Sequence, residues 1–307
     1  MTSDRLFRWL DEPTPGDGRL VLVHSLSGFM DAGSAAQTAV AHLLETCSTR
    51  LLGEFDPDTI IDYRARRPRM TYDVDRFTAV DMPTVQLHEV TDERGTRFLL
   101  LSGPEPDYRW NSFVDEVLEI VDDLGVDLTV GLIGIPWPAP HTRPVGVTFH
   151  ATSPDLIRGH TSTLGEIEIP GHIAALLELR LGESGHDAMG LAVQVPHYLV
   201  QFEYPRSAIA LLRALSGAAG LVLPSDALEE AALQAESEID RQTHESDEFP
   251  PLLAALESQY DAGVAGDADA AEEGGGAPLP DADQIGAQVE RFLAEMDSHR
   301  PEGGTSG

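Results

Sequence analysis

The sequence contains no lysine: all 20 of its lysine-or-arginine positions are arginines. Functions that need a lysine amine are therefore excluded, among them the phosphate-binding lysine of P-loop proteins, the kinase lysine and Schiff-base catalysis. Arginine can bind a phosphate through its planar guanidinium, but it cannot supply a nucleophilic amine. Any chemistry that the chain performs must use other side chains.

Cysteine and long apolar runs are also scarce. Cys47 is the only cysteine, which excludes a disulfide within the chain and a zinc site built from cysteines. No stretch approaches the roughly 18 uninterrupted apolar residues of a membrane-spanning helix. The first residues, MTSDRLFRWLDEP, carry early acidic side chains and do not follow the plan of a signal peptide. Together these features predict a cytoplasmic protein.

Positive charge is the third scarcity. The formal net charge is −32, and residues 226–307 contribute −18 of it through 21 acidic residues against 3 arginines. A surface this negative repels nucleic acid and anionic membranes. We therefore expect neither as a partner.

Strand and helix patterns alternate from about residue 20 to residue 215. Leu20–Leu26 predicts a buried strand, and a glycine turn then leads into a helix over about 34–46. VDLTVGLIGI, at 126–135, is the strongest central-strand pattern, and TVQLHEV with TRFLLLSG predicts a hairpin-like pair. Alternation of this kind builds a sheet covered by helices on both faces. We predict an α/β fold with a mixed, mostly parallel sheet.

The composition divides the chain into four parts. Residues 1–224 predict the α/β core domain, and 225–262 predict acidic helices that pack on or beside it. Residues 263–281 are rich in Gly, Ala and acids and too poor in large apolar groups to fold alone, so we predict a disordered linker. Residues 282–307 predict a short helix and a frayed tail.

The turn from Gly28 to Gly33 is the first candidate site, with two interpretations. Glycines at a strand-to-helix turn let an anion approach the backbone N–H groups at the start of the helix. Alternatively, the glycines only permit the turn, while Asp31 or Ser34 caps the helix. The spacing does not match the dinucleotide-binding fingerprint.

Three proline-flanked segments follow predicted elements and carry aromatic, imidazole and guanidinium groups: PDYRW, GIPWPAPHTRPV and QVPHYLVQFEYP. Ligands of open α/β sheets bind beyond the carboxyl ends of the strands, where these segments could converge. The alternative is that the prolines stiffen loops and the aromatics pack. The candidate ligand-binding residues are Gly28, Asp31, Gly33, Arg109, Trp110, His141, Arg143 and His197.

Other catalytic patterns are weak. HSLSG, which holds Ser25 and Ser27, lacks the first glycine of a nucleophile elbow, although a Ser/His/Asp set could assemble in space from His141 or His197 and Asp31. The histidines show no metal-binding spacing. We predict no catalytic residue, metal or cofactor. A cluster of arginines predicts an oligomer surface or internal salt bridges: Arg64, Arg66, Arg67 and Arg69.

Several segments in combination resemble the proteasome assembly chaperone 2 family, and within it an actinobacterial branch: HSLSGFMDAGSAAQTAV, IIDYRARRP, LLLSGPEPDYRW, GIPWPAPHTRPV with VTFHATS, and PGHIAALLELRLGESG. The resemblance covers about residues 5–260. It implies a nucleoside-phosphorylase-like three-layer fold with C-terminal helices, and a homo-oligomer such as a trimer. It also implies proteasome subunits as partners and no catalytic residues.

We therefore predict a non-enzymatic, protein-binding homo-oligomer of the assembly-chaperone type. The alternative is a small-molecule hydrolase, a phosphorylase-like enzyme or an anionic-ligand binder. Its pocket would lie at the carboxyl ends of the strands.

Overall fold

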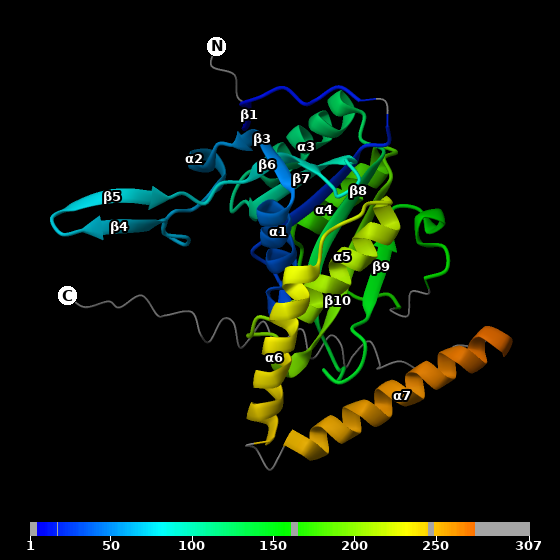
Figure 1. Cartoon of the computed structure of the whole chain (residues 1–307). Helices are drawn as coiled ribbons and strands as arrows, with labels where there is room; N and C mark the ends of the chain where they lie inside the picture. Colours follow the sequence, from blue (N-terminus) through cyan, green and yellow to red (C-terminus); the bar gives the residue numbers. More distant parts are fainter. Residues whose placement is uncertain (1–4, 17, 161–164, 245–248, 274–307) are drawn as a thin grey trace.

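The computed structural model describes residues 5–16, 18–160, 165–244 and 249–273 (Figure 1). At its centre lies an eight-stranded sheet with the order β1-β3-β6-β7-β2-β8-β10-β9. These strands are β1 Phe7–Trp9, β2 Val21–Ser27, β3 Ser48–Phe55, β6 Gln86–Thr91, β7 Arg97–Pro104, β8 Leu128–Trp137, β9 Val147–Ala151 and β10 Ala188–Pro196.

Strand directions make the sheet mixed and mostly parallel, as predicted. The central strands β7, β2, β8 and β10 are parallel neighbours, and β3 runs in the same direction. The strands β1, β6 and β9 run the opposite way. The carboxyl ends of β2, β8 and β10 therefore meet at one edge.

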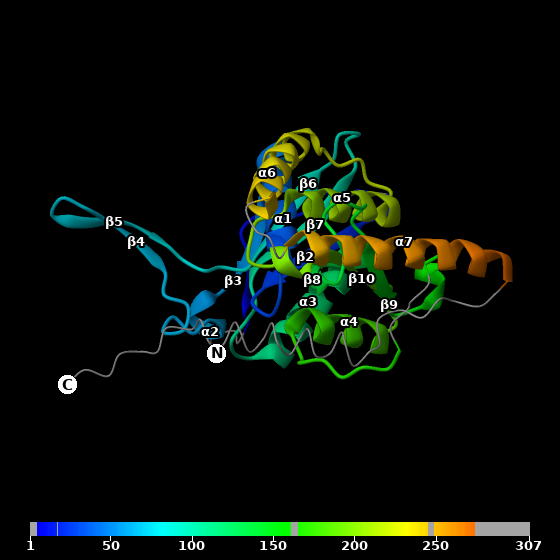
Figure 2. The same ribbon diagram turned by 90° about the horizontal axis from the view of Figure 1, so that it is seen from below.

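Helices cover both faces of the sheet and give three layers (Figure 2). One face packs against α1 Ala35–Thr46, α5 Pro205–Ala219 and α6 Asp226–His244, and the other against α3 Trp110–Leu124 and α4 Ile173–Glu183. The alternation of β2 explains the division, because Val21 and Val23 enter one apolar cluster while Leu22 enters the other. The predicted α/β fold class is confirmed.

A two-stranded hairpin projects from this body (Figures 1 and 2). It consists of β4 Arg69–Asp73 and β5 Arg76–Asp81, which pair only with each other and follow a short helix, α2 Pro57–Ile60. Every residue of both strands is exposed. We call residues 69–81 the hairpin arm.

The C-terminal helices pack against the core. After α6, helix α7 spans Phe249–Glu273 and contacts the loop between β8 and β9 through its first half. It continues through 263–273, where the sequence predicts the start of a linker; residues 274–307, including the predicted short helix, lie outside the described residues. Within the described ranges, no helix is long and apolar enough to cross a membrane.

Candidate functional site

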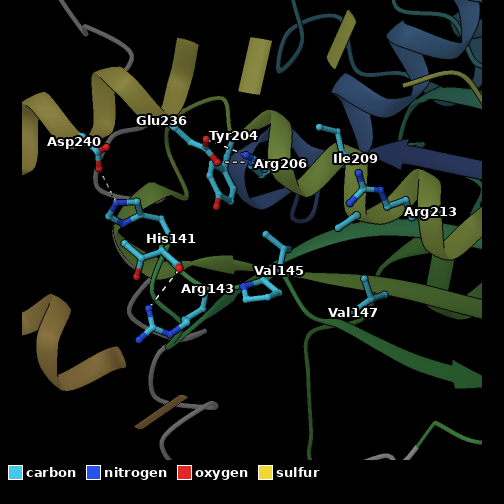
Figure 3. Close-up of a pocket in the computed structure, with 13 residues that line it drawn as sticks. His141, Arg143, Val145, Val147, Tyr204, Arg206, Ile209, Arg213, Glu236 and Asp240 are labelled. Carbon is cyan, nitrogen blue, oxygen red and sulfur yellow. Dashed lines mark hydrogen bonds and ion pairs between the residues drawn. The ribbon is translucent and has the colours of Figure 1, made fainter. Parts of the chain in front are cut away.

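A pocket of about 630 Å³ opens between the β8–β9 loop, α5 and α6 (Figure 3). Two of the predicted residues, His141 and Arg143, lie in its wall after the carboxyl end of β8. The other charged groups that line it come from helices, with Arg206 and Arg213 on α5 and two carboxylates on α6. The pocket thus lies between the α/β core and the C-terminal helix α6.

Two stripes of opposite charge line the contact between α5 and α6. Arg206 and Arg213 are seven residues apart on α5, and Glu229 and Glu236 are seven apart on α6, so each pair shares a helix face. Arg213 Nη2 lies 2.7 Å from Glu229 Oε1. The Arg206 guanidinium binds both oxygens of Glu236, with Nη2 2.9 Å from Oε2, and this hydrogen bonding raises its pKa.

His141 occupies the inner end of the pocket and is nearly buried. The Tyr198 hydroxyl accepts from the His141 backbone N–H at 2.8 Å and lies 2.8 Å from Nδ1. The other ring nitrogen, Nε2, faces Asp240 of α6 at 3.4 Å, so the imidazole bridges Tyr198 and α6. Burial raises the pKa of Tyr198 to about 12, which keeps the hydroxyl protonated for this role.

Arg143 joins the same loop to α7. Its Nε and Nη2 bind the two oxygens of Asp261 at 2.8 Å each, and Nη1 lies 3.3 Å from Glu257. The hydrogen bonds to Asp261 raise the pKa of Arg143 above its ordinary value. All three arginines in the pocket wall therefore have carboxylate partners from α6 or α7. An anionic ligand would have to displace one of those carboxylates.

The Gly28–Gly33 turn lies beside this region, and its geometry favours a structural role. The Asp31 carboxylate accepts from the N–H groups of Ala36 and Gln37 at 2.9 Å, so it satisfies the first turn of α1. Gly33 adopts φ +64°, and a Cβ there would lie 3.1 Å from that of Tyr204, a residue of the pocket wall. A bound anion would compete with Asp31 for these N–H groups.

The predicted residues fall into two groups in space. Asp31, Gly33, His141, Arg143 and His197 lie on the α1 and α5 side, where the His197 ring meets the Tyr198 ring edge-on at 5.3 Å.

Gly28, Arg109 and Trp110 belong to the other group, near α2 and the start of α3. A Cβ at Gly28 would lie 2.8 Å from that of Glu105, and Trp110 Nε1 donates to the carbonyl of Pro106 at 2.6 Å. Arg66, from the predicted arginine cluster, pairs there with Asp107 at 3.1 Å.

Sequence reasoning missed Arg206, Arg213, Glu236 and Asp240. The sequence does hold a signal for this contact, because Arg206 and Arg213 are seven residues apart, as are Glu229 and Glu236. The signal can be used only once the helix over 205–219 has been recognised. Within the described part of the chain, no group of three His, Cys, Asp or Glu side chains is placed to hold a metal ion.

Comparison with known protein families shows to which family the chain belongs. The PAC2 family model matches residues 25–243. The chain belongs to the PAC2 family. That span begins near the end of β2 and takes in every later strand of the sheet, the hairpin arm, both helix layers and nearly all of α6.

Solved PAC2-like structures share the architecture. The chain is similar to the Mycobacterium tuberculosis unknown function protein Rv2714, with 40% identity, a TM-score of 0.82 and coverage of 95% of this chain and 96% of that one. It is similar to the M. tuberculosis proteasome-assembly chaperone homologue Rv2125, with 30% identity, a TM-score of 0.69 and coverage of 76% and 99%.

A more distant likeness shows the fold alone. The archaeal proteasome activator PbaB of Pyrococcus furiosus has 15% identity, a TM-score of 0.57 and coverage of 77% of this chain and 98% of that one. A search of curated proteins found no match.

Proposed function

We propose that this protein is a non-enzymatic assembly factor that forms a homo-oligomer and binds proteasome subunits. The family match and the similarity to a proteasome-assembly chaperone homologue support the chaperone part of the proposal. The hairpin arm supports the part that concerns protein contacts, and it is the observation on which the proposal rests.

The hairpin arm has the composition of a contact surface. Five of its apolar side chains are 50–89% exposed: Met70, Tyr72, Val74, Phe77 and Val80. None belongs to the apolar clusters of the core, so burial within the described fold does not explain them. Val74, at the tip, is branched at Cβ and yet has φ +55°, a strained conformation that is found mostly where function requires it.

A second copy of the chain is the partner that fits the arm best. The arm carries both signs of charge, with Arg69 and Arg76 beside Asp73, Asp75 and Asp81, so its net charge is only −1 and opposite charges can face each other when two arms pair. A strongly acidic molecule needs such a mixed surface to approach its own copy.

A pull-down tests the proteasome part. The tagged full-length chain is incubated with a lysate of a proteasome-containing actinobacterium, and bound proteins are identified by mass spectrometry. We expect enrichment of α-type proteasome subunits, and weaker enrichment by the double variant Tyr72→Ser, Phe77→Ser. If no α-type subunit is enriched over a tag-only control, the proposed proteasome role is wrong.

The alternative function is a binder of small anions in the pocket of His141, Arg143, Arg206 and Arg213. The observation that favours it is the gathering of three guanidiniums on one cavity wall. Calorimetry with inorganic phosphate and with a short acidic peptide tests it. Saturable binding that Arg213→Met abolishes would support this function, and its absence for both probes would remove it.

A further inference from the structure

Two histidines lie at the ends of one row across the sheet, on the face that α4 covers. His24 of β2 is paired with Gly131 of β8, Gly131 with Gly190 of β10, and Gly190 with His150 of β9. A Cβ at Gly131 would lie 2.9 Å from Cε1 of His24, and one at Gly190 would lie 2.0 Å from Cε1 of His150. Each imidazole therefore occupies the space that a side chain on its neighbouring strand would fill.

Helix α4 lies over this row and brings two more titratable groups. Glu178 Oε1 is 2.9 Å from Nδ1 of His150, and His172, at the start of α4, stacks on Phe29 with ring centroids 4.8 Å apart. The underside of α4 is apolar, with Ile173, Leu177 and Leu181 buried against the core. The helix thus lies over a row of three imidazoles and one carboxylate, in which His24 is buried, His172 is half-buried and His150 is exposed at the edge of the sheet.

His24 is the unusual member of this cluster. Its side chain is 3% exposed, and its Nδ1 is buried with no hydrogen-bond partner in the described ranges. Unpartnered buried polar atoms are rare in folded proteins. Burial lowers the pKa of His24 to about 4; the charge of Glu178 opposes this shift, while His172 and His150 add to it. The ring is therefore uncharged at neutral pH.

We propose that His24 acts as a proton-operated latch for α4: the helix stays on the sheet while the ring is uncharged and lifts from it when the ring takes up a proton. A charged His24 under α4 would need water or a counter-charge. Among the described residues, the carboxylate whose charge acts on His24 is Glu178, and it is already bound to His150. In the row between the two histidines, β8 and β10 carry the glycines Gly131 and Gly190, which have no side chain that could pair with the charge. Lifting α4 is then the way to hydrate the new charge.

The titratable groups around His24 act on the opening of α4 in opposite directions. Burial also lowers the pKa of His172, so its protonation adds to the effect of His24. At His150 burial lowers the pKa, but the hydrogen bond to Glu178 and the charge of Glu178 together outweigh it and raise the pKa, so His150 favours the closed state in acid. Glu105 of the β7–α3 connection, which accepts from the N–H of Ile173 at 2.6 Å, has its pKa raised by burial, with Arg66 opposing and Asp107 adding to the shift.

The sign for His24 follows from linkage. A folded-state pKa below the unfolded value of 6.5 gives stability that is lost as the pH falls from about 6.5 towards 4. If the lifted state restores the ordinary pKa of His24, the opening equilibrium of α4 rises about 20-fold between about pH 7 and about pH 5.

Hydrogen–deuterium exchange of the full-length protein, with labelling times corrected for intrinsic rates, tests the latch. We expect α4 peptides to lose protection by about 20-fold on going from about pH 7 to about pH 5. Peptides of α5, on the opposite face, should keep theirs. His24→Leu should remove most of the pH response of α4 and leave only the smaller part that His172 contributes, and the control His160→Leu, a histidine outside the row, should leave the response unchanged.

Three results would overturn the latch. They are an α4 that keeps its protection at about pH 5, an equal loss in α4 and α5, and a pH response that is undiminished in His24→Leu. Glu178→Gln gives a second test that does not depend on His24→Leu folding. Because this variant removes the carboxylate whose charge favours a protonated His24 in the closed state, it should move the opening of α4 to higher pH, and an unchanged midpoint would contradict the account.

Discussion

At the scale of single residues, several glycines of this protein allow a neighbouring backbone or side chain to approach the strand closely. Gly134 of β8 is the clearest case, because a Cβ there would lie 2.4 Å from the carbonyl oxygen of Ala32 and 3.0 Å from Oδ1 of Asp31. The turn that caps α1 therefore rests directly on the strand. Gly217 is the opposite case: it is exposed within α5, and a Cβ there would meet nothing within 4 Å.

These two glycines make a matched prediction. Gly134→Ala should lower the free energy of unfolding by about 1–3 kcal/mol, because the backbone of the turn must move. Gly217→Ala should raise it by up to about 1 kcal/mol, because alanine is the better helix former. Urea denaturation measures both. Equal effects of the two substitutions would show that Gly134 does not hold the turn.

Asp92 gives a prediction about pH. Its carboxylate is buried and accepts from the N–H groups of Val222, Thr96 and Arg94, at 2.7–2.9 Å. Burial alone would raise the pKa of Asp92, but these hydrogen bonds outweigh it and lower the pKa below 3.8. The charged form therefore ties the segment after α5 to the β6–β7 turn.

Asp92→Asn should lower the free energy of unfolding by about 1–3 kcal/mol at neutral pH, because the amide leaves one N–H unsatisfied. A lowered folded-state pKa gives stability that is present above 3.8 and lost only below it. The difference from wild type should thus be the same at about pH 7 and about pH 5. A difference that shrinks across this range would contradict the assignment.

Among the elements, the contact between α5 and α6 depends most on charge. Arg206 and Glu236 are 33% and 26% exposed and form a network with Glu229 and Arg213. Partly buried networks of this kind stabilise more than isolated surface pairs, which contribute about 0–1 kcal/mol. The acidic composition of α6 is therefore matched to the face of α5 on which it packs.

Arg206→Met should increase hydrogen exchange of α6 peptides by about fivefold, the equivalent of about 1 kcal/mol. Arg241→Met is the control, because Arg241 pairs with Glu238 of its own helix, three residues away, at 2.6 Å. An equal increase in both variants would mean that the charge between the helices does not hold α6 on the core.

The elements differ in how well the sequence predicts them. The apolar patterns of β2, β8 and α1 decide their type locally, and each is found within a few residues of its predicted range. The hairpin arm was missed because its strands alternate without a buried face, so the usual contrast between inside and outside is absent. Over 263–273 the sequence predicts a linker because the composition is dominated by Ala, Gly and acids, whereas α7 continues through these residues.

The candidate site was predictable only in part. His141 and Arg143 could be found because a proline-flanked loop after a strong strand is a recognisable place for polar groups. Their partners could not, since Asp240, Glu257 and Asp261 lie about 100 or more residues further along the chain. The placement of Arg109 and Trp110 near α2 likewise depends on how α3 packs, which periodicity does not determine.

Taken as a whole, the molecule combines a conventional three-layer body with one exposed arm. Tyr72 and Phe77 face each other across the arm with ring centroids 5.2 Å apart, and both are at least 60% exposed. Replacing them leaves both core clusters intact, so the arm can be altered without unfolding the body. This separation makes the central claim, a protein-binding oligomer, directly testable.

Sedimentation equilibrium of the full-length protein, compared with the variant Tyr72→Ser, Phe77→Ser, is that test. We predict that the wild-type protein has a mass that is a multiple of 33.2 kDa, and that the folded double variant is monomeric. Circular dichroism confirms that the variant is folded. A wild-type protein that is monomeric at micromolar concentration, or a folded variant with the same oligomeric mass as the wild type, would contradict the account.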